Sequence, residues 1–472
     1  MSVGPERQVS LKRCAPFWVG LGALAVAFLL AWGLSPDGPE PMAKPAKGSG
    51  RPATVGIAGI TVDRGDSEEL AAARPLEERI GAGSVARAED YRSQARRIFL
   101  AGLLLGLLAL GFLAFYRGPP VGFLLARAGR WPFPGAAAVG FSLALVLAIV
   151  RLPFSLAGYD LGREYGLVTQ GRADWFVDLA TSTGITALLA AIGAMVAVAL
   201  WRRMGRRFWL AGSALLAVWA VVLVWLWPVV VSPMFNRFDR LPDGPTRAEV
   251  ERLAGRAGVG IGDVYEVDAS RRSSTLNAYV NGIGPSKRVV IYDNAIRKLS
   301  PAEMSALIAH ELGHVKSNDL YRGLVFAILV IPLAVLFVQL TTSAAVRRSG
   351  DDPDGPGIVP ALALMSALVA LVLSVPGNML SRSIESRADR YALELTSEPG
   401  GLISLQVQLA WANLSDPDPP GPYEFLFGTH PSTRARIVAA EDWGQPENRA
   451  AGRLSTDGGE APDATDHGGD GS

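Results

Sequence analysis

The sequence is poor in the residues that build many metal and redox sites. It has one cysteine, Cys14, and only four histidines among 472 residues. A single cysteine cannot form an intrachain disulfide, and it excludes a cysteine-rich zinc site or an iron–sulfur cluster. Any metal site in this chain must therefore be built from histidines and carboxylates.

Charge is also scarce. Charged residues make up 19% of the chain, hydrophobic residues make up 49%, and the net charge is +1. Ordinary soluble domains carry roughly 25% charged residues. Because the chain has no strong basic field, we expect no nucleic-acid partner, and the apolar excess indicates that its partner is a lipid bilayer.

The apolar residues are gathered in long runs. A helix that crosses the hydrocarbon core needs about 20 mostly apolar residues. We therefore expect a mainly α, polytopic membrane protein with about seven transmembrane helices in the cell membrane. The seven stretches that meet or approach this length are Phe17–Leu34, Ile98–Tyr116, Gly135–Leu156, Leu179–Leu200, Phe208–Val231, Gly323–Thr342 and Ile358–Val375.

The first stretch has a second interpretation. Arg7, Lys12 and Arg13 precede it, as they would in the basic region of a secretory signal. The apolar run is long, however, and no clear A-x-A cleavage site follows it. We therefore expect it to remain as an anchor helix.

The polar segments divide the chain further. The largest insert carries two strand-like runs, Val264–Ser270 and Lys287–Asp293, and predicts a small α+β unit between membrane helices. The predicted regions are an anchor helix with a polar linker (1–97), transmembrane helices two to five (98–231), the α+β zinc protease insert (232–321), helices six and seven (322–378), a helix and His-Pro segment (379–442), and a disordered tail (443–472).

The metal motif lies at the end of the insert. Ser300 and Glu303 form a predicted capping box at the start of a helix. On that helix His310 and His314 are four residues apart, so their imidazoles emerge on one face. Glu311 can reach a water on the same ion. With so few histidines, the chance expectation for H-E-x-x-H is roughly 0.003 matches, which favours a metal site.

A catalytic zinc site takes three protein ligands and leaves a fourth position open. The metzincin third histidine is missing, because Leu320 stands at its position, and His430 and His467 are less suitable alternatives. Glu385 and Asp389 lie one helical turn apart on a later predicted helix. We expect Glu385 to be the third ligand and Asp389 to orient a ligand imidazole through its other N–H, although this spacing also occurs on ordinary solvated helix faces.

These parts predict peptide-bond hydrolysis with one Zn²⁺ per chain. Zinc activates a water and polarises the substrate carbonyl, and Glu311 acts as the general base. An oxyanion develops in the transition state and needs a further donor. His430 and Arg436 are the candidates, although an isolated His-Pro pair is more often an ordinary loop.

The chain resembles the integral-membrane zinc metalloproteases of the CAAX prenyl protease type I kind. The resemblance rests on the seven spans, on HELGH, on E-S-R-A-D (385–389) and on the late His-Pro followed by Arg436. It extends to DYRSQARR (90–97), LPFSLAGYDLGREYGL (152–167), SPMFNRFDRLPDG (232–244) and NAYVNGIGPSKRVVIYD (277–293).

This resemblance implies a ring of membrane helices around a chamber, capped by a gluzincin-like zinc metalloprotease domain. It implies that His310, His314 and Glu385 are the zinc ligands and that Glu311 is the general base. It implies that Asp389 orients a ligand imidazole. It also implies that Asn277, Ala278 and Tyr279 lie on a strand edge that pairs with an extended polypeptide substrate, membrane-associated or prenylated-like, and that His430 and Arg436 stabilise the transition state.

Membrane orientation has two conflicting predictions. With a cytoplasmic N-terminus, the short inside segments carry 12 basic residues and the short outside loop carries 3, which places the zinc domain outside. The resemblance implies a cytoplasmic zinc domain instead. We favour the latter, because Arg92, Arg96 and Arg97 stand beside the second span on that side.

Three rival functions remain open at this stage. An intramembrane-cleaving protease is disfavoured by the polar residues on both sides of the motif helix. A stress-response, quality-control membrane protease usually has fewer spans. A non-catalytic zinc-binding transporter or receptor would need a fourth protein ligand to close a structural site. The sequence does not define an oligomeric state.

Overall fold

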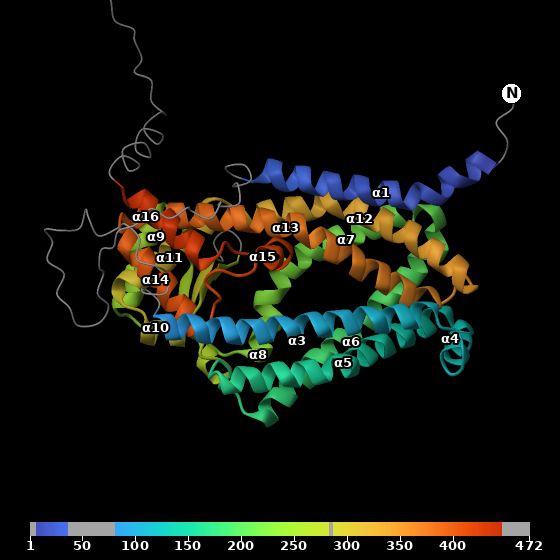
Figure 1. Cartoon of the computed structure of the whole chain (residues 1–472), viewed down its shortest axis with the longest axis horizontal. Helices are drawn as coiled ribbons and strands as arrows, with labels where there is room; N and C mark the ends of the chain where they lie inside the picture. Colours follow the sequence, from blue (N-terminus) through green and yellow to red (C-terminus); the bar gives the residue numbers. More distant parts are fainter. Residues whose placement is uncertain (1–5, 36–80, 283–286, 446–472) are drawn as a thin grey trace, which may run out of the picture.

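A computed structural model describes residues 6–35, 81–282 and 287–445. Long helices run along the long axis of the molecule, and short helices and a small sheet gather at one end (Figure 1). The long helices are α1 (Glu6–Leu34), α3 (Ala82–Phe115), α5 (Pro132–Glu164), α6 (Arg172–Met204), α7 (Phe208–Leu226), α12 (Asp319–Ser349) and α13 (Ile358–Thr396). Most of the predicted disordered tail (446–472, with His467) and most of the polar linker lie outside the described residues, while helix α16 continues to Gly444, two residues into the predicted tail.

The membrane-helix prediction is confirmed. Five described helical stretches are long and apolar enough to cross a membrane, and Val19–Leu34 is a shorter apolar helix. These six segments account for the seven predicted spans to within two residues at their ends, because two spans share the stretch Arg172–Phe235. That stretch contains a 3₁₀ turn at Gly205–Arg207 between α6 and α7, and a π-helical turn at Trp227–Val231 after α7.

The small sheet has four strands in the order β1-β2-β4-β3. Strands β2 and β4 are parallel, and β1 and β3 run antiparallel to them at the two edges. The bounds are β1 (Phe238–Arg240), β2 (Asp263–Val267), β3 (Ala278–Asn281) and β4 (Arg288–Tyr292). The two predicted strands correspond to β2 and β4, but β2 ends early because a 3₁₀ turn, Ala269–Arg271, follows it.

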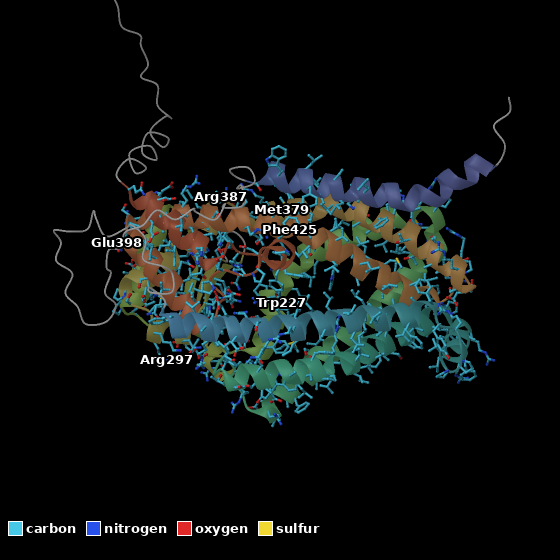
Figure 2. The ribbon with its side chains drawn as sticks, in the orientation of Figure 1. Trp227, Arg297, Met379, Arg387, Glu398 and Phe425 are labelled. Carbon is cyan, nitrogen blue, oxygen red and sulfur yellow. The ribbon has the colours of Figure 1, made fainter. Side chains whose placement is uncertain are left out.

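Short helices surround the sheet and complete the domain at this end of the molecule. Their bounds are α9 (Pro245–Ala257), α10 (Asp293–Lys298), α11 (Pro301–Lys316), α14 (Pro399–Ala412) and α16 (Thr433–Gly444). Helix α8 (Ser232–Phe235) leads into the sheet, and α15 (Gly421–Phe427) packs against α13. Helix α4 (Val121–Gly129) lies at the opposite end of the bundle, between α3 and α5 (Figure 1). The core is formed by one face of the sheet, α9, α11 and α14. Figure 2 places Arg297 and Glu398 at this end, and Trp227 and Met379 nearer the middle of the long axis.

Helix α11 begins at the predicted capping box. Ser300 Oγ accepts a hydrogen bond from the Glu303 N–H at 3.4 Å, and the Ser300 N–H donates to Glu303 Oε2 at 2.8 Å. Pro301 occupies the first helical position, where its missing N–H costs nothing. The reciprocal bonds fix the start of the helix, and so they fix the direction in which His310 and His314 face.

Helix α13 is longer than the sequence indicates. The predicted seventh span ends at Val375, and the helix that carries Glu385 was expected as a separate segment. The structure instead has one continuous helix of 39 residues, with Pro376 inside it. Proline removes one backbone hydrogen bond but can be accommodated within a helix, so one rigid element extends from the bundle to the sheet domain.

Helices α11 and α13 lie close together at Gly313. A Cβ atom added there would lie 3.2 Å from the Tyr391 ring and 3.3 Å from the Ala388 backbone. These distances are shorter than ordinary van der Waals contact, so a side chain would force the two helices apart. The glycine of HELGH therefore lets α11 and α13 pack more closely than a residue with a side chain would.

We predict that Gly313→Leu lowers the free energy of unfolding by about 1–3 kcal/mol or more through overpacking. The same separation should reduce metal binding, because α11 carries the predicted ligands His310 and His314 and α13 carries the predicted ligand Glu385. Thermal unfolding of the detergent-solubilised protein and metal content measure both effects. Gly255→Ala in α9 is the control, since a Cβ there meets nothing within 4 Å; equal effects of the two substitutions would contradict the packing argument.

Candidate metal centre

Three candidate ligands converge where α11 crosses α13. The donor atoms of His310, His314 and Glu385 lie within 4.8 Å of one another. The two Nε2 atoms are 3.2 Å apart, and Glu385 oxygens lie 3.3 Å from His310 Nε2 and 3.6 Å from His314 Nε2. Bonds of about 2.0–2.1 Å to a tetrahedral ion place its donors roughly 3.3–3.4 Å apart. The spacing fits such an ion.

The protonation pattern gives an independent test of the fit. His310 Nδ1 lies 2.8 Å from Asp389 Oδ1, and His314 Nδ1 lies 3.0 Å from Asp319 Oδ2. Each carboxylate favours the tautomer with its proton on Nδ1. The two Nε2 lone pairs then face each other beside Glu385 Oε2, a buried oxygen without a hydrogen-bond partner among the described residues. A cation satisfies all three groups at once.

The electrostatics of α11 agree with this arrangement. Burial lowers the pKa of His310, but the neighbouring carboxylates of Asp389 and Glu385 outweigh it and raise the pKa to about 10. The position between these groups therefore attracts positive charge strongly. Burial also raises the pKa of Glu311, which makes its carboxylate a stronger base than an exposed glutamate.

Asp389 is held in turn by Arg436. The guanidinium donates two hydrogen bonds to this carboxylate, from Nε at 2.7 Å and from an Nη atom at 2.6 Å. The same Nη atom lies 3.5 Å from His310 Nδ1. The bidentate geometry fixes the carboxylate against the imidazole, so the observed contacts of Arg436 reach the metal position through Asp389.

Asp319 supports the second imidazole, and sequence reasoning missed it. Its carboxylate contacts His314 and also accepts hydrogen bonds from Arg322, at 3.3 Å, and from Arg387. Asn318 has a φ of 55°, and this left-handed residue turns the chain between α11 and α12 so that Asp319 faces back to His314. An acidic residue five positions after the second histidine was the available signal.

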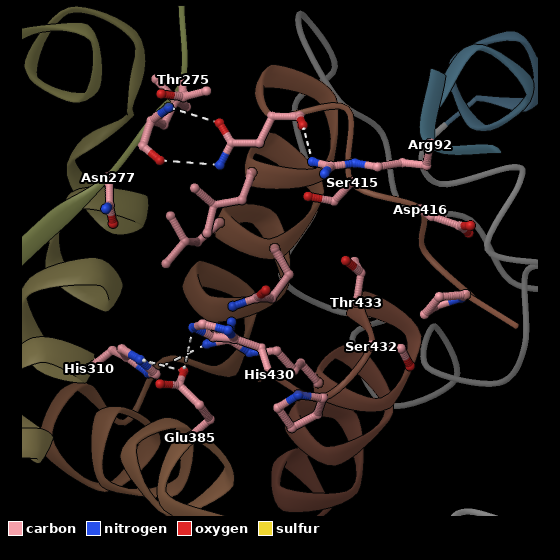
Figure 3. Close-up of a pocket in the computed structure, with 18 of the residues that line it drawn as sticks. Arg92, Thr275, Asn277, His310, Glu385, Ser415, Asp416, His430, Ser432 and Thr433 are labelled. Atoms are coloured by element: carbon pink, nitrogen blue, oxygen red, sulfur yellow. Dashed lines mark hydrogen bonds and ion pairs between the residues drawn. The ribbon is translucent and has the colours of Figure 1, made fainter. Parts of the chain in front are cut away.

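Four further predicted residues, Asn277, Glu311, His430 and Arg436, line one cavity of about 720 Å³ together with His310 and Glu385. Glu311 lies in its wall beside His310, and His430 Nε2 lies 3.4 Å from Glu385 Oε2. Asn277 lines the cavity at the start of strand β3, to which Ala278 and Tyr279 belong. Figure 3 shows His310, Glu385 and His430 on one side of this cavity, with Asn277, the residue before β3, on the wall above His310.

Together, these features define the class of protein: a multi-pass membrane protein with a metallopeptidase centre at the end of its helix bundle. A family model described as peptidase family M48 matches residues 241–444. A second model, described as the CAAX prenyl protease N-terminal region with five membrane helices, matches residues 68–237.

The relatives identify the family. An uncharacterized metalloprotease of Bacillus subtilis, YhfN, is 31% identical over 328 residues, which cover 68% of this chain and 77% of the relative. A CAAX prenyl protease 1 homolog of rice is 32% identical over 235 residues, 47% of this chain and 53% of the relative. The crystal structure of S. mikatae Ste24p has the same fold, with a TM-score of 0.68 at 20% identity, covering 89% of this chain and 97% of that one.

This chain belongs to the M48 peptidases, and it is a membrane metallopeptidase. The family resemblance stated from the motifs is thereby confirmed, as are the enzyme class and the multi-pass membrane location. The rival class of non-catalytic transporters is not supported by any of these matches.

We predict that Asp319→Asn weakens metal binding by about 10- to 100-fold, because the ligand His314 loses the anion that orients it. Competition with a chelator of known affinity measures the change. Asp243→Asn is the matched control, since the Asp243 side chain is fully exposed. Unchanged affinity in Asp319→Asn would show that the bond to His314 has no effect on the ligand.

Proposed function

We propose that this protein is a zinc metalloendopeptidase that cleaves extended, membrane-associated polypeptides. The proposal rests chiefly on the convergence of His310, His314 and Glu385 around one point in a cavity that Glu311 and His430 also line. Two imidazole nitrogens and one carboxylate oxygen form a typical donor set of catalytic zinc. One ion per chain would be held there, with a fourth position facing the cavity.

The bound zinc would supply a Lewis acid and lower the pKa of a water in the site. Glu311 accepts a proton from the attacking water and returns it to the leaving amine. Its pKa, raised by burial, brings it closer to working pH and improves this exchange. His430 donates a hydrogen bond to the oxygen that becomes negative in the transition state.

Arg436 contributes positive potential to the same transition state. Because its guanidinium is paired with Asp389, its main effect is to hold that carboxylate, and hence His310, in position. Its Nη atom at 3.5 Å from His310 Nδ1 adds a positive charge behind the imidazole. Arg436 is thus a positioning residue in this proposal, while His430 faces the substrate.

The substrate lies along β3 as an added strand. This strand is at the edge of the sheet and packs against α11, which carries Glu311. The backbone of Ala278 faces the free edge, and its N–H is held at 3.0 Å by the side chain of Asn277, a bond that substrate can replace. Asn277 and Tyr279 project from the opposite face to Ala278. Main-chain pairing of this kind accepts many sequences.

The position of the cavity suggests a membrane-associated class of substrate. The cavity opens where membrane helices meet the sheet domain, and Phe99 of α3 and Tyr423 of α15 contribute apolar surface to it. Several relatives are named CAAX prenyl protease 1. Comparing one peptide with and without a prenyl group, at equal concentration in the same detergent, tests whether lipidation raises kcat/KM for this chain.

We predict that Glu311→Gln keeps its bound zinc and loses peptide cleavage by about 10²–10⁴-fold, because the amide cannot accept the proton. Elemental analysis gives the zinc content, and mass spectrometry of a membrane-derived peptide gives cleavage. Glu251→Gln, an exposed substitution on α9, serves as the control. A Glu311→Gln protein as active as wild type, or a wild type without zinc, would overturn the hydrolase proposal.

His430→Ala separates a catalytic from a structural metal site. His430 is the histidine nearest to the three ligands within the described chain, and its side chain is 55% exposed. If it stabilises the transition state, the variant retains zinc and loses kcat by about 10²–10³-fold. If it instead closes a structural site as a fourth ligand, zinc itself is lost. Zinc content and single-turnover cleavage on one preparation distinguish the two results.

A further inference from the structure

Asn413 makes an unusual pair of contacts at the end of the edge strand. Its Oδ1 accepts a hydrogen bond from the Leu276 N–H at 2.9 Å, and its Nδ2 donates to the Leu276 carbonyl at 3.2 Å. A side-chain amide carries the same donor and acceptor as a peptide group. Asn413 therefore makes with Leu276 both bonds that a neighbouring strand would make.

The strand alternation shows which edge these bonds occupy. The Asn277 carbonyl accepts from the Tyr292 N–H at 3.0 Å, so the backbone of Asn277 faces β4. In an antiparallel pair, successive residues direct their backbone groups to alternate sides. Leu276 and Ala278 therefore both face away from β4, toward the edge along which no described strand lies. Asn413 has filled the first of these two positions.

A membrane helix holds Asn413 in place. Arg92 of α3 donates from Nε to the Leu414 carbonyl at 2.6 Å and from an Nη atom to the Asn413 carbonyl at 2.7 Å. Arg96, one turn on, pairs with Asp416 at 2.6 Å. These two arginines belong to the DYRSQARR segment, which the proposed chemistry leaves without a role. Figure 3 shows Arg92 and Asp416 across the cavity from Asn277.

We propose that Asn413 is the end-stop of the substrate strand and thereby sets how far a polypeptide can pair with β3. This inference rests on the proposed peptidase function. A substrate strand can use the outward positions of Ala278 and Val280, but it meets an occupied position at Leu276. Thr275, Leu276 and Asn413 all line the cavity, so the stop lies within the substrate space.

Loss of Asn413 has different effects on substrate length dependence if it is an end-stop than if it only anchors the loop after α14. If Asn413 only anchored the loop after α14 to the sheet, its loss would reduce the cleavage of all substrates alike. If it is an end-stop, its loss exposes the N–H and carbonyl of Leu276 to substrate. Longer peptides would then gain backbone hydrogen bonds that shorter peptides cannot make.

The test is a peptide ladder. One cleaved parent peptide is lengthened a residue at a time at each end, and kcat/KM is measured by mass spectrometry for wild type, Asn413→Gly and Asn413→Ser. For wild type we expect kcat/KM to stop rising at one end at a fixed length. In both variants it should continue to rise for about two further residues, by about two- to tenfold, the contribution of one or two hydrogen bonds. Arg92→Lys should give a smaller change in the same direction.

Asn378→Ser is the matched control, because Asn378 donates to the Leu426 carbonyl at 2.8 Å, away from this edge. Its ladder should equal that of wild type. An unchanged limiting length in both Asn413 variants, with activity reduced equally for all peptides, would overturn the end-stop. If Asn413→Gly does not fold, as judged by zinc content and thermal unfolding, Asn413→Ser decides. Failure of the peptidase proposal is distinct, because wild type would then cleave no member of the ladder.

Discussion

The close crossing of α11 and α13 is the constraint on which the site depends. Two candidate ligands come from α11 and the third from α13, so the Glu385 oxygens reach 3.3 and 3.6 Å from the two histidine Nε2 atoms only if the helix axes are close together. Gly313 permits this approach, because any Cβ there would press on Ala388 and Tyr391. The capping box at Ser300 fixes the residue at which α11 begins. Packing and capping therefore set the geometry before any ion binds.

The crossing would be unstable if its charges were not balanced. Asp389 and Asp319 are buried, with exposed fractions of 4% and 7%, and burying an unpaired carboxylate is strongly unfavourable. Each is paired with an imidazole and with arginine: Asp389 with Arg436, and Asp319 with Arg322 and Arg387. The same bonds that stabilise the two carboxylates direct both Nε2 atoms to one point, so charge balance and ligand orientation have a common origin.

The sequence predicted the parts of this site that depend on local spacing. HELGH and the four-residue spacing of Glu385 and Asp389 place side chains on single helix faces, and the structure brings both sets together. It did not reveal Asp319, because that contact depends on the left-handed turn at Asn318. The predicted end of the seventh span was also not the end of a helix. Hydropathy falls there, but helix α13 continues. Strand β1 is only three residues long, too short for a periodic pattern.

The continuity of α13 joins the membrane bundle to the metal position. Glu385 lies on the same helix as the predicted seventh span, so a displacement of that span along its axis would move the third ligand relative to His310 and His314. Helix α3 makes a second connection, since its Arg92 holds the chain at Asn413 and Leu414. Two membrane helices thus contribute to one cavity: α13 carries the candidate ligand Glu385, and α3 holds the chain at Asn413 beside Leu276. In the proposed binding mode, a polypeptide between them would be held in register by the bundle as well as by the sheet.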